Sequence, residues 1–83
     1  MSYVVKWTTQ STKILKKLPE KIALRIWNKT QELKENPFRY LKYYEGKGFK
    51  FRIGDYRALI DVDFENKILK IRVLDKRGRV YKK

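Results

Sequence analysis

The 83-residue chain contains no cysteine and no histidine. Without cysteine it can form no disulfide framework, and without either residue it lacks the two commonest zinc ligands. No apolar run approaches the roughly 20 residues of a membrane span, and the N-terminus lacks the apolar core of a signal peptide. We therefore expect a soluble, cytoplasmic protein with no metal, no cofactor and no membrane partner.

Acidic residues are scarce as well, because 9 Asp plus Glu stand against 22 Lys plus Arg, a formal net charge of +13. This balance indicates a polyanionic partner, and nucleic acid is the first candidate. The plain alternative is a lysine-rich surface that only keeps the protein soluble. A chain of this length builds one small domain with a modest core, so we expect a single domain over residues 1–83.

The segment 49–57, FKFRIGDYR, carries the strongest pattern in the chain. Apolar and basic residues alternate over its first five positions, which is typical of a strand with one apolar and one basic face. Gly54-Asp55 then predicts a two-residue type II′ hairpin turn. Such a turn sets Arg52 directly opposite Arg57, and like charges facing each other across a ladder are destabilising. We infer that an anion binds beside this pair.

The other segments predict a β-α-α-β-β-β(β) order. The expected elements are a strand at 3–8, a helix from Thr8 or Thr9 to about 17, a helix from 20 to about 35, a loop or short helical turn over 38–48, strands at 49–53, 56–62 and 68–75, and an extended piece at 80–81. Pro19 separates the helices, so we expect an antiparallel helical hairpin. The fold class is α+β, a twisted antiparallel sheet with this hairpin on its apolar face. The sheet edge is the natural place for the first strand.

A second turn centred on Glu65-Asn66 continues the apolar face onto the third strand of this sheet. The predicted apolar pairs are Val62 with Leu69, Ile60 with Ile71 and Ala58 with Val73. The opposite face should then carry two rows, Lys50–Leu59–Arg72 and Arg52–Arg57–Leu74.

These motifs resemble the RelE toxins of the RelE/ParE superfamily, with archaeal-like features. The likeness covers nearly the whole chain and includes the KKLP end of the first helix, the RIGDYR hairpin and the C-terminal KRGRVY. The resemblance implies a RelE-like microbial RNase fold and a toxin of a type II toxin–antitoxin system. Such a toxin enters the ribosomal A site, cleaves the mRNA there and so inhibits translation. The implied partners are a cognate RelB-like antitoxin, a 70S-type ribosome with its rRNA, and mRNA.

The family's catalytic pattern maps onto five residues of this chain, Lys50, Arg52, Arg57, Arg77 and Tyr81. They would support metal-independent cleavage, in which the RNA 2′-hydroxyl attacks the adjacent phosphate. Tyr81 or Lys50 would act as general base, and Arg57 and Arg77 would stabilise the phosphorane. A histidine that precedes the last arginine in many relatives is replaced by Lys76. Only two residues follow Tyr81, so we expect the antitoxin to mask or neutralise the site directly rather than to displace a C-terminal helix.

Further basic residues are predicted to bind ribosomal RNA in a salt-dependent way. They are Lys13, Lys16, Lys17, Lys21, Arg72, Lys76 and Arg79. The plain alternative for Arg52 and Arg57 is docking on rRNA without catalysis. Asp61 opposite Lys70 indicates an ordinary cross-strand ion pair, and Trp7 and Trp27 are expected in the core.

Three other functions stay open. A ParE-like relative would poison DNA gyrase without cutting RNA, and a degenerate toxin would bind its antitoxin or RNA without cutting. An RNA-binding module of the RRM type would display aromatic rings on its open sheet face. Phe49, Phe51 and Tyr56 are instead predicted on the core face, which argues against that module.

Overall fold

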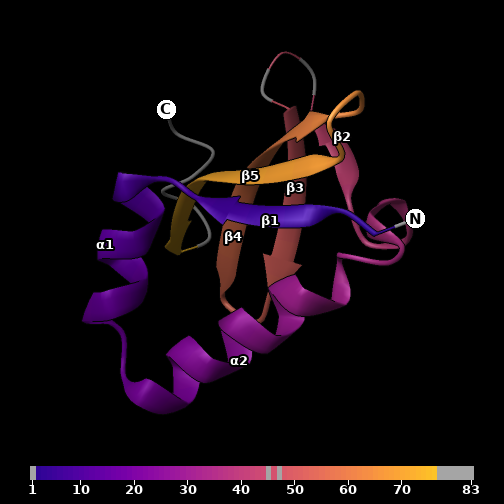
Figure 1. Cartoon of the computed structure of the whole chain (residues 1–83). Coiled ribbons are helices and arrows are strands. Elements are labelled where there is room, and N and C mark those ends of the chain that lie inside the picture. The colour runs from indigo at the N-terminus through magenta and orange to yellow at the C-terminus, as the bar shows by residue number, and fades with distance from the viewer. Residues whose placement is uncertain (1, 45, 47, 77–83) are drawn as a thin grey trace.

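The computed structural model describes residues 2–44, 46 and 48–76. Within them the elements are β1 (Val4–Trp7), α1 (Thr9–Lys17), α2 (Glu20–Glu32), the 3-10 helix η1 (Pro37–Arg39), β2 (Lys42–Tyr44), β3 (Gly48–Ile53), β4 (Tyr56–Asp63) and β5 (Ile68–Lys76). The helices precede four of the strands and cover one side of the sheet, as predicted (Figure 1). None of the helices in the described part is both long and apolar enough to cross a membrane.

The sheet has the strand order β1-β5-β4-β3-β2. Strands β2 to β5 pair antiparallel with their neighbours, whereas β1 pairs parallel with β5. The first strand therefore lies at the sheet edge, as expected, and makes the sheet mixed. The segment 38–48 is more ordered than predicted, since η1 is followed by the short strand β2. The predicted piece at 80–81 lies outside the described residues.

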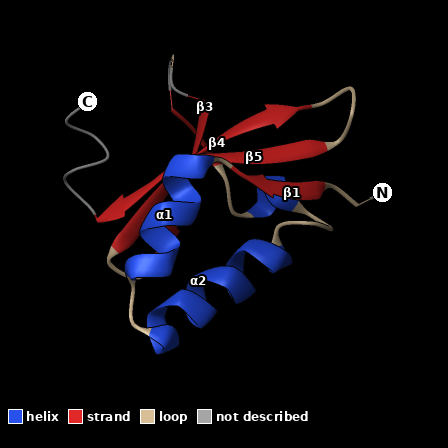
Figure 2. Cartoon of the chain, turned by 60° about the vertical axis from the view of Figure 1, so that its left-hand side comes forward, coloured by secondary structure: helices blue, strands red, loops and turns tan. Residues whose placement is uncertain are grey.

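The helices begin and end where local chemistry requires. Thr8 caps α1, since its Oγ1 accepts the Ser11 N–H at 3.2 Å and the Ser11 Oγ accepts the Thr8 N–H at 3.0 Å. This reciprocal pair satisfies two N–H groups that the first helical turn leaves unpaired. Pro19 then ends α1 and starts α2. From the linker the two helices diverge as an open V (Figure 2).

The core lies between α2 and the apolar face of the sheet. Its largest fully buried apolar side chains are Ile26, Leu33, Ile60, Leu69, Ile71 and Leu74. The helical spacing of apolar residues predicts one buried stripe on α2, made of Ile22, Ala23, Ile26, Trp27, Thr30 and Leu33. The structure confirms it at Ile26 and Leu33. Trp27, in contrast, is 44% exposed and stacks on Trp7 with ring centroids 6.0 Å apart. The α2 stripe is therefore buried on one side and open on the other.

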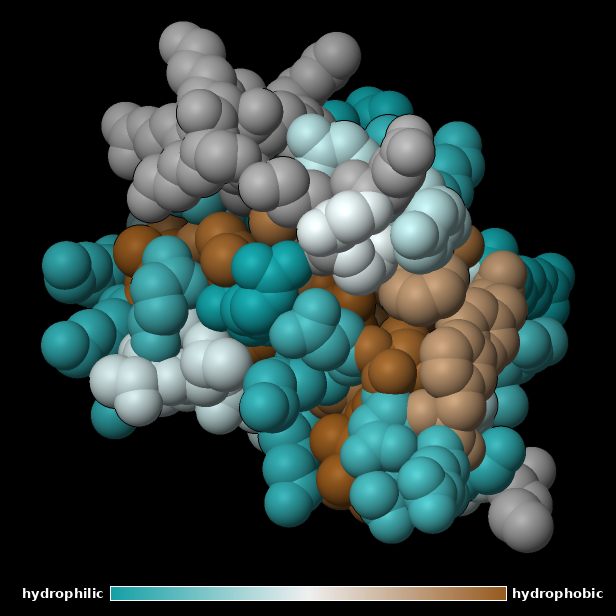
Figure 3. Space-filling model, turned by 90° about the horizontal axis from the view of Figure 1, so that it is seen from above, coloured by the Kyte–Doolittle hydropathy of each residue, from teal (hydrophilic) through white to brown (hydrophobic). Residues whose placement is uncertain are grey.

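An aromatic cluster closes the end of the core near η1. Phe38 packs against Phe49 at 5.6 Å and against Tyr3 at 6.1 Å between ring centroids. Phe64 stacks on Phe38 and remains largely exposed. Seen from above, apolar surface reaches solvent between hydrophilic residues (Figure 3). The sequence of 38–48 allows two interpretations of its aromatic residues, as base-stacking rings or as a cover for one end of the core. At Phe38 the structure supports the cover, because this ring packs on Tyr3 and Phe49.

Candidate functional site

A β-bulge in β5 sets the register of the sheet face that points away from the helices. Ile60 pairs with Ile71, but Leu59 pairs with Val73, so Arg72 is an extra residue in its strand. The predicted pairs of Val62 with Leu69 and Ile60 with Ile71 are confirmed. The pair of Ala58 with Val73 is wrong, because the bulge shifts every later residue of β5 by one position.

The two predicted rows on this face change for the same reason. One row is Lys50–Leu59–Val73 and the next is Arg52–Arg57–Asp75. Arg72 and Leu74 are therefore not in these rows. Asp75 stands beside Arg57 instead, and this carboxylate partly offsets the arginine pair.

The N-terminus of α1 holds the bulge in place. Thr8 Oγ1 donates to the Arg72 carbonyl at 2.9 Å, and Ser11 Oγ donates to the Ile71 carbonyl at 2.8 Å. The Leu74 N–H donates to Gln10 Oε1 at 3.4 Å. Strand β1 ends at Trp7, opposite Ile71, so within the described residues no strand pairs with β5 on that side beyond this point. The hydroxyls and the amide replace the missing ladder and satisfy backbone groups that would otherwise be costly to bury.

Four basic residues lie side by side on this face of β2, β3 and β4, and we call them the basic face: Lys42, Lys50, Arg52 and Arg57. Lys42 pairs with Lys50 across β2 and β3, and Arg52 pairs with Arg57 across β3 and β4. The Arg52–Arg57 pair was predicted from the hairpin and is confirmed. Lys42 was missed, because three residues are too few for a period-two pattern to reveal β2. Two like-charged cross-strand pairs in adjoining rows make a strong local positive potential.

Arg57 is held by its own turn. Its Nη1 donates to the carbonyls of Gly54 at 2.9 Å and Tyr56 at 3.0 Å, and the residue is only 6% exposed. Arg52, its cross-strand partner, is exposed. A guanidinium held in one orientation is suited to bind a developing charge, whereas a solvated one is better suited to first contact with a polyanion. The two arginines of the pair are therefore not equivalent.

The remaining candidates in the described part lie on several surfaces. Lys50 is half-buried, with its Nζ 5.5 Å from the ring centroid of Tyr44. Arg72 forms an ion pair with Asp61, with Nε 3.1 Å from Oδ2, so the acid predicted to pair with Lys70 binds the bulged arginine. The other lysines are exposed, on α1, the first turn of α2 and the end of β5: Lys13, Lys16, Lys17, Lys21 and Lys76. Arg77, Arg79 and Tyr81 lie outside the described residues.

Other chemistries find little support on this face. Within residues 2–44, 46 and 48–76, no three His, Cys, Asp or Glu side chains gather closely enough to hold a metal ion. Phe51 is buried, and Phe49 and Tyr56 pack half-buried against the core. These rings are therefore on the helix side, which contradicts the open aromatic platform of an RRM-like module.

Comparison with known proteins places this geometry among toxins. The family profile described as the ParE toxin of the type II toxin–antitoxin system parDE matches residues 5–81. A chain of the RelBE2 toxin–antitoxin complex from Mycobacterium tuberculosis is 30% identical, with a TM-score of 0.84 over 93% of this chain and 100% of the other. In the archaeal RelE–RelB complex from Pyrococcus horikoshii, a chain is 32% identical, with a TM-score of 0.81 over 95% and 99%. The isolated E. coli RelE toxin shares the fold, with 20% identity and a TM-score of 0.75 over 98% and 93%. No curated protein sequence matches the chain.

Proposed function

The chain belongs to the ParE toxin family of type II toxin–antitoxin systems, within the RelE/ParE superfamily, and we propose that it is a ribosome-dependent endoribonuclease. It would cleave mRNA in the ribosomal A site and so inhibit translation in the cytoplasm. The observation that carries this proposal is the basic face, where Arg57 is fixed beside Arg52 in one row and Lys42 adjoins Lys50 in the next. A gyrase poison has no need of such a phosphate-binding constellation.

The proposed reaction is an internal transfer at phosphorus. The 2′-oxygen of the RNA forms a bond to the adjacent phosphorus, the bond from phosphorus to the 5′-oxygen breaks, and a 2′,3′-cyclic phosphate and a 5′-hydroxyl result. Lys50 or Tyr81 would take the 2′-hydroxyl proton, and Arg77 or a lysine would assist the leaving oxygen. Arg57 would stabilise the phosphorane with the N–H groups that its turn does not use, a contribution of about 3 kcal/mol per donor in comparable sites.

The rest of the basic surface would position the toxin on the ribosome. Lys13, Lys16 and Lys17 on α1 and Lys21 on α2 are exposed and unshielded by the sheet. Their contacts with rRNA phosphates should weaken steeply with salt. Because this chain lacks the histidine that suits acid–base work near neutral pH, the ribosome must supply much of the rate by orienting the mRNA. The proposed partners are thus the ribosome, mRNA and a RelB-like antitoxin.

The test is single-turnover cleavage of mRNA on programmed ribosomes, read by primer extension. Arg57→Lys keeps the charge but loses the planar fork, and we expect the rate to fall about 10²–10³-fold. The matched control is Arg39→Lys on η1, which should cleave like the wild type. Thermal unfolding must accompany both, since Arg57 also braces its turn. A folded Arg57→Ala variant that cleaves at the full rate would refute the assignment.

The second candidate is the gyrase-poison activity of ParE, which the matched family profile favours. DNA breaks in induced cells, without discrete cuts within codons of a message, would select it. Absence of both kinds of cut, together with antitoxin binding, would identify a catalytically degenerate toxin.

A further inference from the structure

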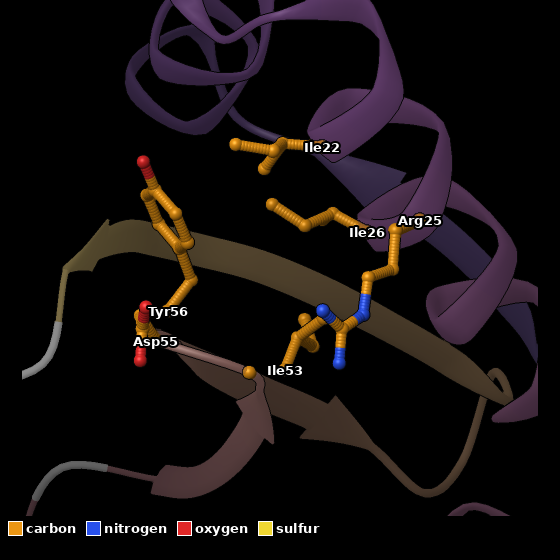
Figure 4. Close-up of a pocket in the computed structure, with 7 residues that line it drawn as sticks. Ile22, Arg25, Ile26, Ile53, Asp55 and Tyr56 are labelled. Carbon is orange, nitrogen blue, oxygen red and sulfur yellow. The ribbon is translucent and has the colours of Figure 1, made fainter.

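A small cavity lies behind the β3–β4 turn, on the side of the sheet opposite to the basic face. It encloses about 80 Å³ between α2 and the hairpin, and we call it the hairpin pocket. The residues that carry its chemistry are Ile22, Arg25, Ile26, Ile53, Asp55 and Tyr56 (Figure 4). The volume exceeds the roughly 30 Å³ share of one water molecule and is of the order of a short aliphatic side chain.

The floor of the pocket is apolar and its mouth is open. Ile26 and Ile53 are buried beneath it, while Ile22 is 37% exposed at its rim. An exposed isoleucine beside an apolar hollow is a surface that an aliphatic side chain can cover with a gain in burial. The pocket therefore suits a hydrophobic anchor from another molecule.

The rim adds a permanent positive charge. Within the described residues Arg25 makes no hydrogen bond or ion pair, and it is exposed on α2. Its Nη1 lies 3.3 Å from the position that a Cβ on Gly54 would occupy, so the guanidinium packs flat against the turn. A planar guanidinium with open donors is a receptor for a carboxylate, which it can bind through two parallel hydrogen bonds.

We propose that the hairpin pocket docks the antitoxin, through an aliphatic side chain that enters the pocket and a neighbouring carboxylate that binds Arg25. The identity of this partner rests on the proposed function. A second copy of the chain is a poor occupant, because two molecules of charge +13 repel each other. RNA offers the phosphate but no aliphatic group for the floor. An acidic protein segment with apolar anchors provides both features.

An antitoxin bound in the hairpin pocket could affect Arg57, the proposed catalytic arginine, from the opposite side of the sheet. The Cα of Gly54 lies against the Arg25 guanidinium. The carbonyl of Gly54 accepts a hydrogen bond from Arg57 Nη1 at 2.9 Å. The same turn thus connects the pocket to the basic face. An antitoxin held at Arg25 would contact the turn that orients Arg57 without having to cover the RNA-binding surface.

The test measures binding of a purified RelB-like antitoxin, by calorimetry and without ribosomes. Ile22→Asp and Arg25→Glu should each raise the dissociation constant at least tenfold, as expected for loss of a central anchor. Leu24→Asp, also exposed on α2, and Arg39→Glu make the same chemical changes outside the pocket and should stay within about threefold. All four positions are exposed, so melting temperatures should confirm that the variants remain folded.

Several outcomes would overturn the proposal. These are equal losses in pocket and control variants, unchanged affinity in all of them, and no binding by the wild-type chain. A fourth outcome is that the pocket variants lose only the binding of a short RNA, or only self-association measured by light scattering. Either result would show that the pocket binds RNA or a second copy of the chain instead of the antitoxin. Because affinity is measured directly, a toxin that fails to cleave mRNA can still confirm the pocket, and an active toxin can still refute it.

Discussion

The hydroxyl of Thr8 forms hydrogen bonds with both the first turn of α1 and the bulge of β5. Removing this hydroxyl tests directly how much that connection contributes to stability. Thr8→Val keeps the shape of the side chain and deletes only its hydrogen bonds. The hydroxyl accepts the Ser11 N–H as a helix cap, which is typically worth about 1 kcal/mol. It also donates to the Arg72 carbonyl at 2.9 Å, for about 1 kcal/mol more. We expect the free energy of unfolding to fall by about 2 kcal/mol.

Ser11 shares part of this work, so the two sites should not be independent. The Ile71 carbonyl accepts from Ser11 Oγ at 2.8 Å and from Thr8 Oγ1 at 3.1 Å. Thr8 shares its single hydroxyl hydrogen between the Ile71 and Arg72 carbonyls, so the Ile71 carbonyl keeps a hydroxyl donor when either residue alone is replaced. The double variant, Thr8→Val with Ser11→Ala, leaves this carbonyl with the weaker Thr8 N–H at 3.2 Å. The double variant should therefore cost more than the sum of the single changes, by about 0.5–1 kcal/mol. For a domain of this size the total stability is only about 4–12 kcal/mol.

The assay is urea unfolding followed by tryptophan fluorescence, for which Trp7 is the adjacent reporter. Thr9→Val is the matched control, because Thr9 is exposed at the first helical position and should change stability by less than about 0.5 kcal/mol. Thr8→Ser retains the hydroxyl and should therefore keep most of the stability that Thr8→Val loses. The reasoning fails if Thr8→Val lowers the free energy of unfolding no more than Thr9→Val does, or if Thr8→Ser lowers it as much as Thr8→Val. Either result would show that the hydrogen bonds of the Thr8 hydroxyl contribute nothing to stability.

Two further predictions concern the ends of the strands. Gly48→Ala should destabilise the fold by about 2 kcal/mol more than Gly46→Ala in the same unfolding assay. The reason is that a Cβ at Gly48 would stand 2.8 Å from the Ile60 carbonyl oxygen, whereas a Cβ at Gly46 meets nothing within 4 Å. Equal losses of stability would show that both costs come from positive φ alone. The side-chain and backbone N–H groups of Asn66 lower the pKa of Asp63, so this turn should stabilise the fold fully above the ordinary pKa of Asp63 and lose that contribution as pH falls through the lowered value. Asn66→Ala should raise the pKa of Asp63 in a carboxyl NMR titration, and an unchanged titration would contradict the assignment.

Local patterns predicted the parts of the fold that local chemistry determines. The alternation and turn residues of 49–57 specified the hairpin, and the pairing of Arg52 with Arg57 followed from a two-residue loop. The bulge could not be found in the same way. Its cause is a pair of hydroxyls near residue 10 that bond carbonyls near residue 71, and no sequence period signals a contact that far apart. The row predictions beyond the bulge failed for this reason.

Periodicity likewise predicted which way side chains point but not how deeply they lie. The α2 stripe correctly placed Ile26, Thr30 and Leu33 in the core, yet Ile22 and Trp27 on the same stripe are substantially exposed. The open V between the helices leaves that part of α2 uncovered. The bracing of Arg57 was also unpredicted, because a guanidinium that bonds the backbone of its own turn follows no residue pattern.

The Gly54 turn is where the proposed activity and the proposed inhibition meet. With φ +57, Gly54 has a backbone conformation that other residues adopt only with strain, and a side chain there would also crowd Arg25. Its carbonyl meanwhile fixes Arg57 on the opposite face. A change at Gly54 that weakens antitoxin binding should therefore also disturb the catalytic arginine. Toxins that escape inhibition yet still cleave mRNA should instead carry changes at the rim, at Ile22 or Arg25, which do not touch Arg57.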